Sequence, residues 1–169
     1  MTKNIILIGM SGVGKSTIGK QLSKKLKKSF IDLDSVICDK YHLSLPEIIA
    51  KLGKNAFLNL EEETCLELNF DNLVCAPGGS LIYSDKAMHY CKENAIVIYL
   101  KDSLENLKTR VINWESRGII GLNSDTYEGV FNERQALYQN YADITIACNH
   151  RSWTEISADI IEQLNRYSS

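Results

Sequence analysis

A glycine-rich segment near the N-terminus constrains the fold more than any other part of this sequence. It follows the apolar run 5–8 and matches the pattern G-x-x-x-x-G-K-[ST] at every defined position, as Gly9-Met10-Ser11-Gly12-Val13-Gly14-Lys15-Ser16. The next segment, 17–27, carries apolar side chains at a helical spacing of four. A strand, a glycine-rich turn and a helix in this order predict a loop that wraps the phosphates of a nucleoside triphosphate.

The chemistry of this loop assigns roles to its residues. Glycines let the backbone approach the phosphates closely, and the start of the helix presents its positive dipole end to them. We expect Lys15 to reach the β- and γ-phosphates and Ser16 to offer its hydroxyl to Mg²⁺. The predicted nucleotide-binding residues of the loop are Gly12, Val13, Gly14, Lys15, Ser16 and Thr17. A glycine-rich turn without a ligand would not need the Lys-Ser pair at the start of the helix.

Lysines gather on and after this helix, at positions 20, 24, 25, 27 and 28. We interpret them as a solvated helix face whose charge complements the helix end. The formal net charge of the chain is −2, so a nucleic acid or an anionic membrane is not an expected partner.

Chain length and cysteine content indicate the number of domains and the cellular compartment. The chain of 169 residues suits a single domain with a full core, so we predict one domain over residues 1–169. The five cysteines are odd in number and none are spaced as CxxC, which favours reduced thiols over a disulfide framework or a zinc site. The apolar run at the N-terminus is too short for a secretory or membrane segment. We therefore expect a cytoplasmic protein, and we expect it to be a monomer.

Short apolar runs alternate with helical patterns along the whole chain. The expected strands are 5–8, 30–33, 73–76, 95–100 and 144–147. The expected helices are 17–27, 35–41, 45–52, 54–68, 84–92, a helix capped by Ser103, 126–141 and 153–167. This alternation predicts an α/β fold in which helices cover both faces of a parallel sheet, with ligands at the carboxyl ends of the strands.

Two aspartates lie at the end of the second expected strand. Asp32 and Asp34 are two residues apart, so in an extended chain both side chains would point to the same side. One carboxylate could hold Mg²⁺ through water and the other could act as the base for an acceptor hydroxyl. The alternative is that an aspartate caps the helix expected at 35–41.

Two further segments carry weaker signals. The third strand is followed by Pro77-Gly78-Gly79-Ser80, where glycines permit a close approach of the backbone to a ligand. The segment 113–124 contains two glycines and few helix signals, which predicts a mobile loop.

With these motifs in place, the chain resembles the shikimate kinase family over essentially its whole length. The resemblance is carried by the loop at 9–16, the Asp-x-Asp at 32–34, Phe57 and Glu61 on a helix, the glycines at 78–79, the region 110–121 and Glu133-Arg134 with Leu137-Tyr138. It implies a three-layer αβα P-loop fold, a five-stranded parallel sheet of order 2-3-1-4-5, a helical substrate-binding region after the second strand, and a lid at about 113–123. It also implies ATP- and Mg²⁺-dependent phosphorylation of the 3-hydroxyl of shikimate, a small-molecule substrate.

The resemblance also implies residue roles. The catalytic residues would be Lys15, Asp34 and Arg117, and Ser16 and Asp32 would hold the metal. Arg110, Arg117 and Trp153 would join the loop in binding the nucleotide, although Trp153 could equally be a core residue of the last helix. The acceptor would be bound by Asp34, Phe57, Gly78, Gly79 and Arg134.

The part of the site that is expected to bind the acceptor departs from the family pattern. The family has an arginine that grips the substrate carboxylate where this chain has Leu58, a third glycine where it has Ser80, and a proline where it has Gly118. Either another cation such as Lys51 or Lys54 substitutes for the arginine, or Leu58 forms part of an apolar wall for a different acceptor such as gluconate, homoserine or a nucleotide. A third alternative is a nucleotide-binding regulatory module without turnover, against which Asp34, Arg117 and Arg134 argue.

Overall fold

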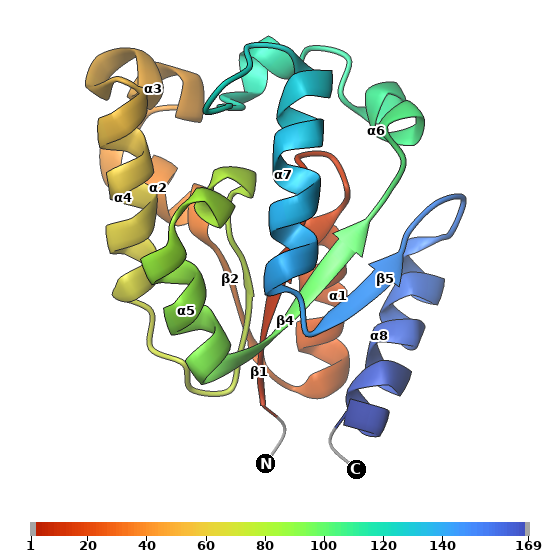
Figure 1. The fold of residues 1–169 in the computed structure, drawn as a ribbon. Coiled ribbons are helices and arrows are strands. Elements are labelled where there is room, and N and C mark those ends of the chain that lie inside the picture. The colour runs from red at the N-terminus through yellow and green to blue at the C-terminus, as the bar shows by residue number, and fades with distance from the viewer. Residues whose placement is uncertain (1–2, 168–169) are drawn as a thin grey trace.

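The strands form one parallel sheet whose order places the phosphate-binding loop near its centre. The computed structural model describes residues 3–167, apart from the side chain of Glu115. Within this range the sheet has five strands in the order β2-β3-β1-β4-β5 (Figure 1). The strands are β1 (Asn4–Ile8), β2 (Ser29–Asp32), β3 (Leu73–Ala76), β4 (Ala95–Lys101) and β5 (Ile144–Ala147). The predicted fold class and strand order are confirmed.

Helices cover both faces of this sheet. They are α1 (Lys15–Leu26), α2 (Leu33–Tyr41), α3 (Leu45–Leu52), α4 (Lys54–Leu66), α5 (Asp85–Asn94), α6 (Leu104–Arg110), α7 (Tyr127–Tyr141) and α8 (Trp153–Tyr167). Two 3₁₀ helices, η1 (Gly79–Tyr83) and η2 (Trp114–Arg117), follow β3 and α6. Helices α1 and α8 pack together on one face, and α5 and α7 contact β4 on the other (Figure 1). The helices α2, α3 and α4 pack against one another beside β2 and form the expected helical region.

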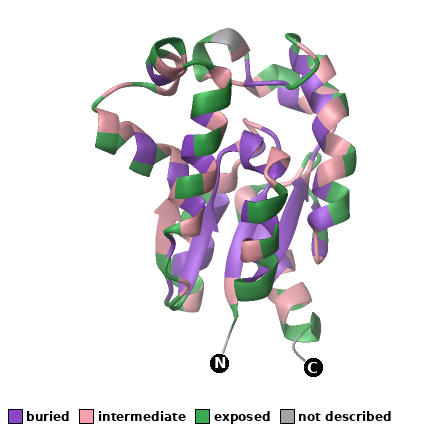
Figure 2. Ribbon diagram, turned by 60° about the vertical axis from the view of Figure 1, so that its left-hand side comes forward, coloured by how far each residue is buried: buried purple, intermediate pink, exposed green. Residues whose placement is uncertain are grey.

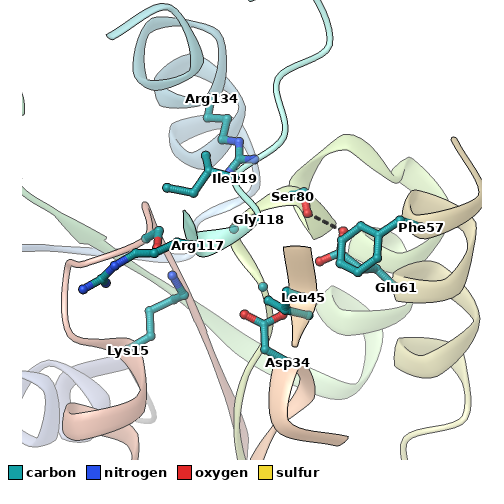
Figure 3. A pocket seen from close by; sticks show the side chains of 13 residues that line it. Lys15, Asp34, Leu45, Phe57, Glu61, Ser80, Arg117, Gly118, Ile119 and Arg134 are labelled. Carbon is teal, nitrogen blue, oxygen red and sulfur yellow. Dashed lines mark hydrogen bonds between the residues drawn. The ribbon is translucent and has the colours of Figure 1, made fainter. Parts of the chain in front are cut away.

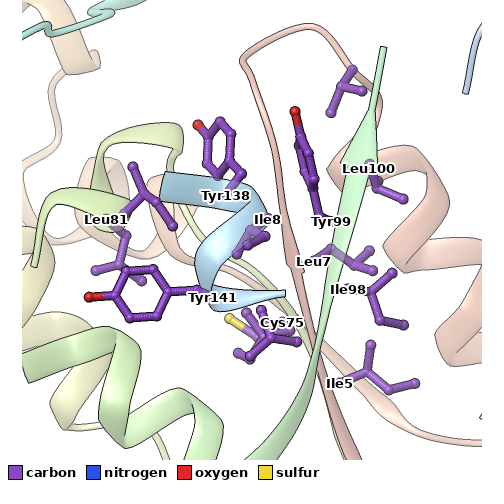
Figure 4. Packing of buried hydrophobic residues seen from close by; sticks show 14 of the residues in the cluster. Ile5, Leu7, Ile8, Cys75, Leu81, Ile98, Tyr99, Leu100, Tyr138 and Tyr141 are labelled. Carbon is purple, nitrogen blue, oxygen red and sulfur yellow. The ribbon is translucent and has the colours of Figure 1, made fainter. Parts of the chain in front are cut away.

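The core lies on both sides of β1 and β4, because these central strands are buried along nearly their whole length (Figure 2). Continuous Ile, Leu and Val runs are typical of strands covered on two faces. Tyr99 of β4 stacks on Tyr138 of α7 with ring centroids 5.2 Å apart, which fixes α7 over the sheet (Figure 4). This packing places α7 over β4, and α7 also contacts η1, which follows β3.

The structure differs from the sequence-based expectations at three places. Strand β2 ends at Asp32, so Asp34 lies in the first turn of α2 and not on an extended chain. The segment expected to be a plain loop contains the turn of 3₁₀ helix η2. Lys28 is buried and donates a hydrogen bond to the Asn72 side chain at 3.0 Å, so it does not belong to the solvated lysine face.

None of the helices within residues 3–167 has the length and apolar character needed to cross a membrane.

Candidate active site

The loop between β1 and α1 has a backbone that requires glycine. Gly12 and Gly14 have φ angles of 89° and 104°, which L-residues with a side chain rarely adopt. A Cβ atom would lie 2.4 Å from Val111 Cγ2 at Gly12, and 2.6 Å from Trp153 Cζ3 at Gly14. The loop is thus tightly enclosed by Val111, which directly follows α6, and by Trp153 of α8.

Lys15 is the first residue of α1, and its ammonium group lies over the loop. Its Nζ donates hydrogen bonds to the carbonyl oxygens of Gly9 at 2.7 Å and Met10 at 3.1 Å. Burial lowers the pKa of Lys15 to about 8, and the Asp34 carboxylate opposes that shift. Bound phosphates would favour the charged ammonium further, because nearby negative charge raises an amine's pKa.

A cavity of about 360 Å³ opens beside the loop. It is lined by Ser11, Gly12, Gly14, Lys15, Ser16, Thr17, Asp32, Asp34, Pro77, Arg110, Arg117 and Trp153. Arg110 is held by buried Asp102 at 3.0 Å, and its guanidinium carbon lies 5.0 Å from the centre of the Trp153 ring. Trp153 therefore packs against the core while it also lines this cavity, and its role in binding the nucleotide base stays a prediction.

Ser16 and Asp32 meet on the floor of the same cavity. The Ser16 hydroxyl donates a hydrogen bond to Asp32 Oδ2, and Asp32 Oδ1 accepts one from the backbone N–H of Ser35 at 3.1 Å. Asp32 thus caps α2 and also faces the loop. A hydroxyl and a carboxylate beside a phosphate site are the hard oxygen ligands that Mg²⁺ prefers, so these residues fit the expected metal.

A second cavity adjoins the first on the side of α4 and η1 (Figure 3). It is lined by Ser11, Lys15, Asp34, Leu45, Phe57, Glu61, Gly78, Gly79, Ser80, Arg117, Gly118, Ile119 and Arg134. Lys15, Asp34 and Arg117, the three predicted catalytic residues, line both cavities. They therefore stand where a group bound in one cavity would meet a group bound in the other.

Asp34 is positioned by the first turn of α2. Burial raises the pKa of its carboxyl to about 6, although the ammonium of Lys15 acts in the opposite direction. A base with a pKa near neutrality is well matched to proton abstraction at physiological pH.

Arg134 enters the second cavity from α7. Its guanidinium donates to the carbonyl oxygen of Ile120 and, from Nε, to the Tyr83 hydroxyl at 3.2 Å. A Cβ on Gly79 would lie 2.5 Å from Arg134 Nη1, so this glycine leaves room for the guanidinium. Tyr138 reinforces the arrangement, since its hydroxyl donates to the Gly79 carbonyl oxygen at 2.8 Å.

The segment 113–123, which we expect to be a lid, touches the helical region. Arg117 is exposed and lines both cavities, while Gly118 lies against α3. A Cβ on Gly118 would be 3.0 Å from both Leu45 Cβ and Ile49 Cδ1. Gly118 has a φ of 66°, which proline cannot adopt, so the observed backbone is incompatible with the family's proline at this position.

The expectations about position 58 are corrected by the structure. Leu58 is half-buried on α4 and is not among the described residues that line the second cavity, whose apolar wall includes Leu45 and Phe57. Neither proposed substitute cation lines the described part of the cavity: Lys51 is exposed and Lys54 donates to the carbonyl oxygen of Leu122 at 3.3 Å.

Sequence reasoning assigned no role to Glu61, Ser80 or Tyr83. Glu61 opens the run Glu61-Glu62-Glu63, and a run of charges is usually a solvated face. The helix phase instead buries the first of the three. Its spacing of four from Phe57, which puts both on one side of α4, is the signal that could have identified it.

The comparisons with known proteins agree with this geometry. The sequence model described as shikimate kinase matches residues 11–165. The chain belongs to the shikimate kinase family. A shikimate kinase of Bacillus subtilis (strain 168) is 36% identical over 166 residues, covering 96% of this chain and 89% of the relative.

Solved structures of the shikimate kinase family are also similar. A shikimate kinase from Acinetobacter baumannii in complex with shikimate has a TM-score of 0.89 and 28% identity, covering 99% of this chain and 95% of the other. A gluconokinase from Sinorhizobium meliloti has a TM-score of 0.60 at 14% identity over 98% of this chain and 93% of the other, which shows a shared fold alone. Membership of this family supports an ATP-dependent small-molecule kinase and not a nucleotide-binding module without turnover.

Proposed function

We propose that the chain transfers the γ-phosphoryl group of ATP to the 3-hydroxyl of shikimate. The observation that carries this proposal is the junction of two cavities at Lys15, Asp34 and Arg117. One cavity has the loop and helix start that bind phosphates, and the other has a carboxyl base and a buried guanidinium. A donor and an acceptor can thus meet across one set of charged side chains.

Two charged side chains recognise opposite ends of the acceptor. Arg134 offers a buried cation for a carboxylate, and Asp34 offers an acceptor for hydroxyl protons. A small hydroxy acid fits this polarity, and the A. baumannii relative was solved with such a compound, shikimate. Gly78 and Gly79 leave room for Asp34, Glu61 and Arg134, because a Cβ at either glycine would collide with these side chains.

The transfer step depends on positioning and on charge. Asp34 accepts the proton of the attacking hydroxyl, whose oxygen then bonds to phosphorus as the bond to the departing diphosphate breaks. Lys15, the loop N–H groups and Arg117 stabilise the negative charge on the transferring oxygens. Ser16 and Asp32 would hold Mg²⁺, which when bound neutralises phosphate charge.

The nucleotide base would lie by Arg110 and Trp153. Both side chains line the first cavity, and a guanidinium and an indole are suited to stacking on a planar ring. Residues 1–169 would work as one kinase domain. The expectations of a cytoplasmic monomer stay predictions.

The absence of the family's arginine at position 58 is the observation behind a second candidate, the same reaction with another acceptor. Loss of a charge-assisted contact costs roughly 1.5–3 kcal/mol, which would weaken binding of an anionic acceptor by roughly 10- to 100-fold. Gluconate, homoserine and nucleotides are the compounds to compare.

A coupled ADP-release assay separates the candidates. The protein is incubated with ATP, Mg²⁺ and each compound in turn, and the product is identified by mass spectrometry. We expect the highest kcat/KM with shikimate. Turnover of another hydroxyl compound without any shikimate phosphorylation would replace the acceptor, and ADP release with none of them would remove the kinase assignment.

A further inference from the structure

Glu61 is a buried carboxyl group inside the second cavity, the proposed acceptor site, which is called the acceptor cavity below. Only 4% of its surface is exposed, and α4 directs it toward η1 and α2 (Figure 3). Its two oxygens have different surroundings. Oε2 accepts a hydrogen bond from Ser80, whereas a Cβ on Gly78 would lie 2.5 Å from Oε1 and also 2.5 Å from Asp34 Oδ1. The two carboxyl groups therefore flank Gly78 and share one wall of the cavity.

No cation balances this carboxyl directly. Within the described residues, no lysine or arginine forms a salt bridge with Glu61, although Lys15 and Arg134 line the same cavity. A buried carboxylate without an ion pair is costly unless a hydrogen bond satisfies it. The Ser80 hydroxyl, itself only 6% exposed, supplies the hydrogen bond that the structure records at the Glu61 side chain.

Position 58 explains why this hydroxyl is needed. Residues three apart on a helix are neighbours on its surface, so a cation at position 58 could pair with the carboxyl at position 61. Leu58 carries no charge, and it lies three residues before Glu61 on α4. The two departures from the family pattern, Leu58 and Ser80, thus concern the same carboxyl group.

We propose that Ser80 is a positioning residue that holds Glu61 in the acceptor cavity in place of a cation at position 58. The Ser80 hydroxyl fixes Oε2, so that Oε1 and Asp34 together present a carboxyl wall to the hydroxyls of the acceptor. This inference rests on the proposed function for the identity of the acceptor, but the Ser80–Glu61 relationship does not.

The first test compares two serine variants that remove similar bonds. Ser80→Ala deletes the bond to Glu61, and Ser84→Ala deletes the bond from Ser84 to the neighbouring Glu62 at 2.6 Å, outside the cavity. Ser84 also caps α5, so its loss provides a matched decrease in stability. We expect Ser80→Ala to raise the KM for shikimate about tenfold with little change in the KM for ATP, because the loss of one buried hydrogen bond would leave Glu61 without a fixed orientation. We expect Ser84→Ala to leave both constants near wild type, and equal effects of the two variants would overturn the proposal.

The second test is a rescue. Leu58→Arg places a cation beside Glu61, so Ser80 should become dispensable when both changes are combined. We expect Ser80→Ala to raise the shikimate KM less than about twofold in the Leu58→Arg background, against about tenfold in the wild type. Ser80→Thr, which keeps a hydroxyl, should behave like wild type. Additive effects of Leu58→Arg and Ser80→Ala would contradict the proposed exchange of roles.

The third test needs no acceptor and therefore separates this inference from the proposed function. Burial raises the pKa of Glu61 to about 8, with Ser80 acting to lower it, and the nearby charges of Asp34, Arg134 and Lys15 also contribute. Carboxyl-carbon NMR titration of Glu61 should show a higher pKa in Ser80→Ala than in wild type. An unchanged titration would overturn the role of Ser80. A wild type that does not phosphorylate shikimate but shows this shift would overturn only the acceptor assignment.

Discussion

The hydroxyl of Ser16 donates a hydrogen bond to the carboxylate of Asp32, which joins the first turn of α1 to the end of β2. The contact brings together a loop residue and an acidic residue that are 16 positions apart in the sequence. Both groups line the first cavity, beside the phosphate-binding loop. The two residues that we predict to hold Mg²⁺ are therefore hydrogen-bonded to each other in this structure.

Asp32 should affect the magnesium requirement separately from its capping role. Asp32→Asn keeps a side-chain oxygen that can cap α2 but removes the carboxylate charge, whereas Asp32→Ala also loses the cap, at a cost of about 1 kcal/mol. We expect both variants to need several-fold more Mg²⁺ for half-maximal activity, and only Asp32→Ala to melt at a lower temperature. An unchanged Mg²⁺ titration in Asp32→Asn would exclude this carboxylate from the metal site.

Lys15→Ala should abolish most turnover while the fold persists. The substitution deletes a cation beside the phosphates but little core volume, since Lys15 is only half-buried on the cavity side. By analogy with other groups that stabilise transition-state charge, kcat should fall by roughly 100- to 1,000-fold. Circular dichroism and thermal melting serve as the control for folding. A folded variant with near wild-type kcat would show that the loop lysine is not catalytic here.

Asp34 should set the acid limb of the pH profile. Burial raises the pKa of its carboxyl to about 6, and the base is active only when ionised. As pH falls through about 6 the group gains a proton, so kcat/KM should decrease, reaching about tenfold per pH unit well below that value. A pH profile of kcat/KM at saturating Mg²⁺ measures this limb. Asp34→Asn should bind ATP but transfer no phosphate, and normal transfer by this variant would disprove the base assignment.

The lid should respond to ligands unevenly along its length. The backbone N–H groups of Leu122 and Asn123 already donate to the Glu133 carboxylate at 2.8 and 2.9 Å, while Arg117 is exposed. We expect amide hydrogen exchange over 113–119 to slow when ATP and acceptor are both bound, with much smaller changes at 122–123. Closure would exclude water from the transferring group. Equally fast exchange over 113–119 with and without ligands would rule out a lid.

Leu58→Arg should improve the use of shikimate. A cation at this position would add positive charge near a cavity in which Arg134 is the buried guanidinium, and a charge-assisted contact contributes roughly tenfold or more. Steady-state kinetics with shikimate should therefore show a lower KM than the wild type. If the native acceptor is a different compound, the same substitution should impair its phosphorylation, because an unpaired charge would then be introduced beside the cavity.

The sequence by itself determined the phosphate-binding loop and the sheet. The loop residues are contiguous, and their glycines, lysine and serine act through local backbone geometry that any chain with this pattern must adopt. The strands were identifiable because buried parallel strands have uninterrupted apolar runs. The strand order 2-3-1-4-5 came from the family resemblance, since no local pattern encodes which strands become neighbours.

Only the tertiary structure decided which further side chains, beyond those that the family resemblance implied, join the acceptor side of the site. Glu61 belongs to a charged run that looks solvated in sequence, and the packing of α4 against η1 buries it beside Ser80. Asp34 reaches the cavity from the first turn of a helix, and Arg134 reaches it from a helix a hundred residues later. Which side chains converge depends on helix phase and on contacts between distant segments, and neither is written in the spacing of neighbouring residues.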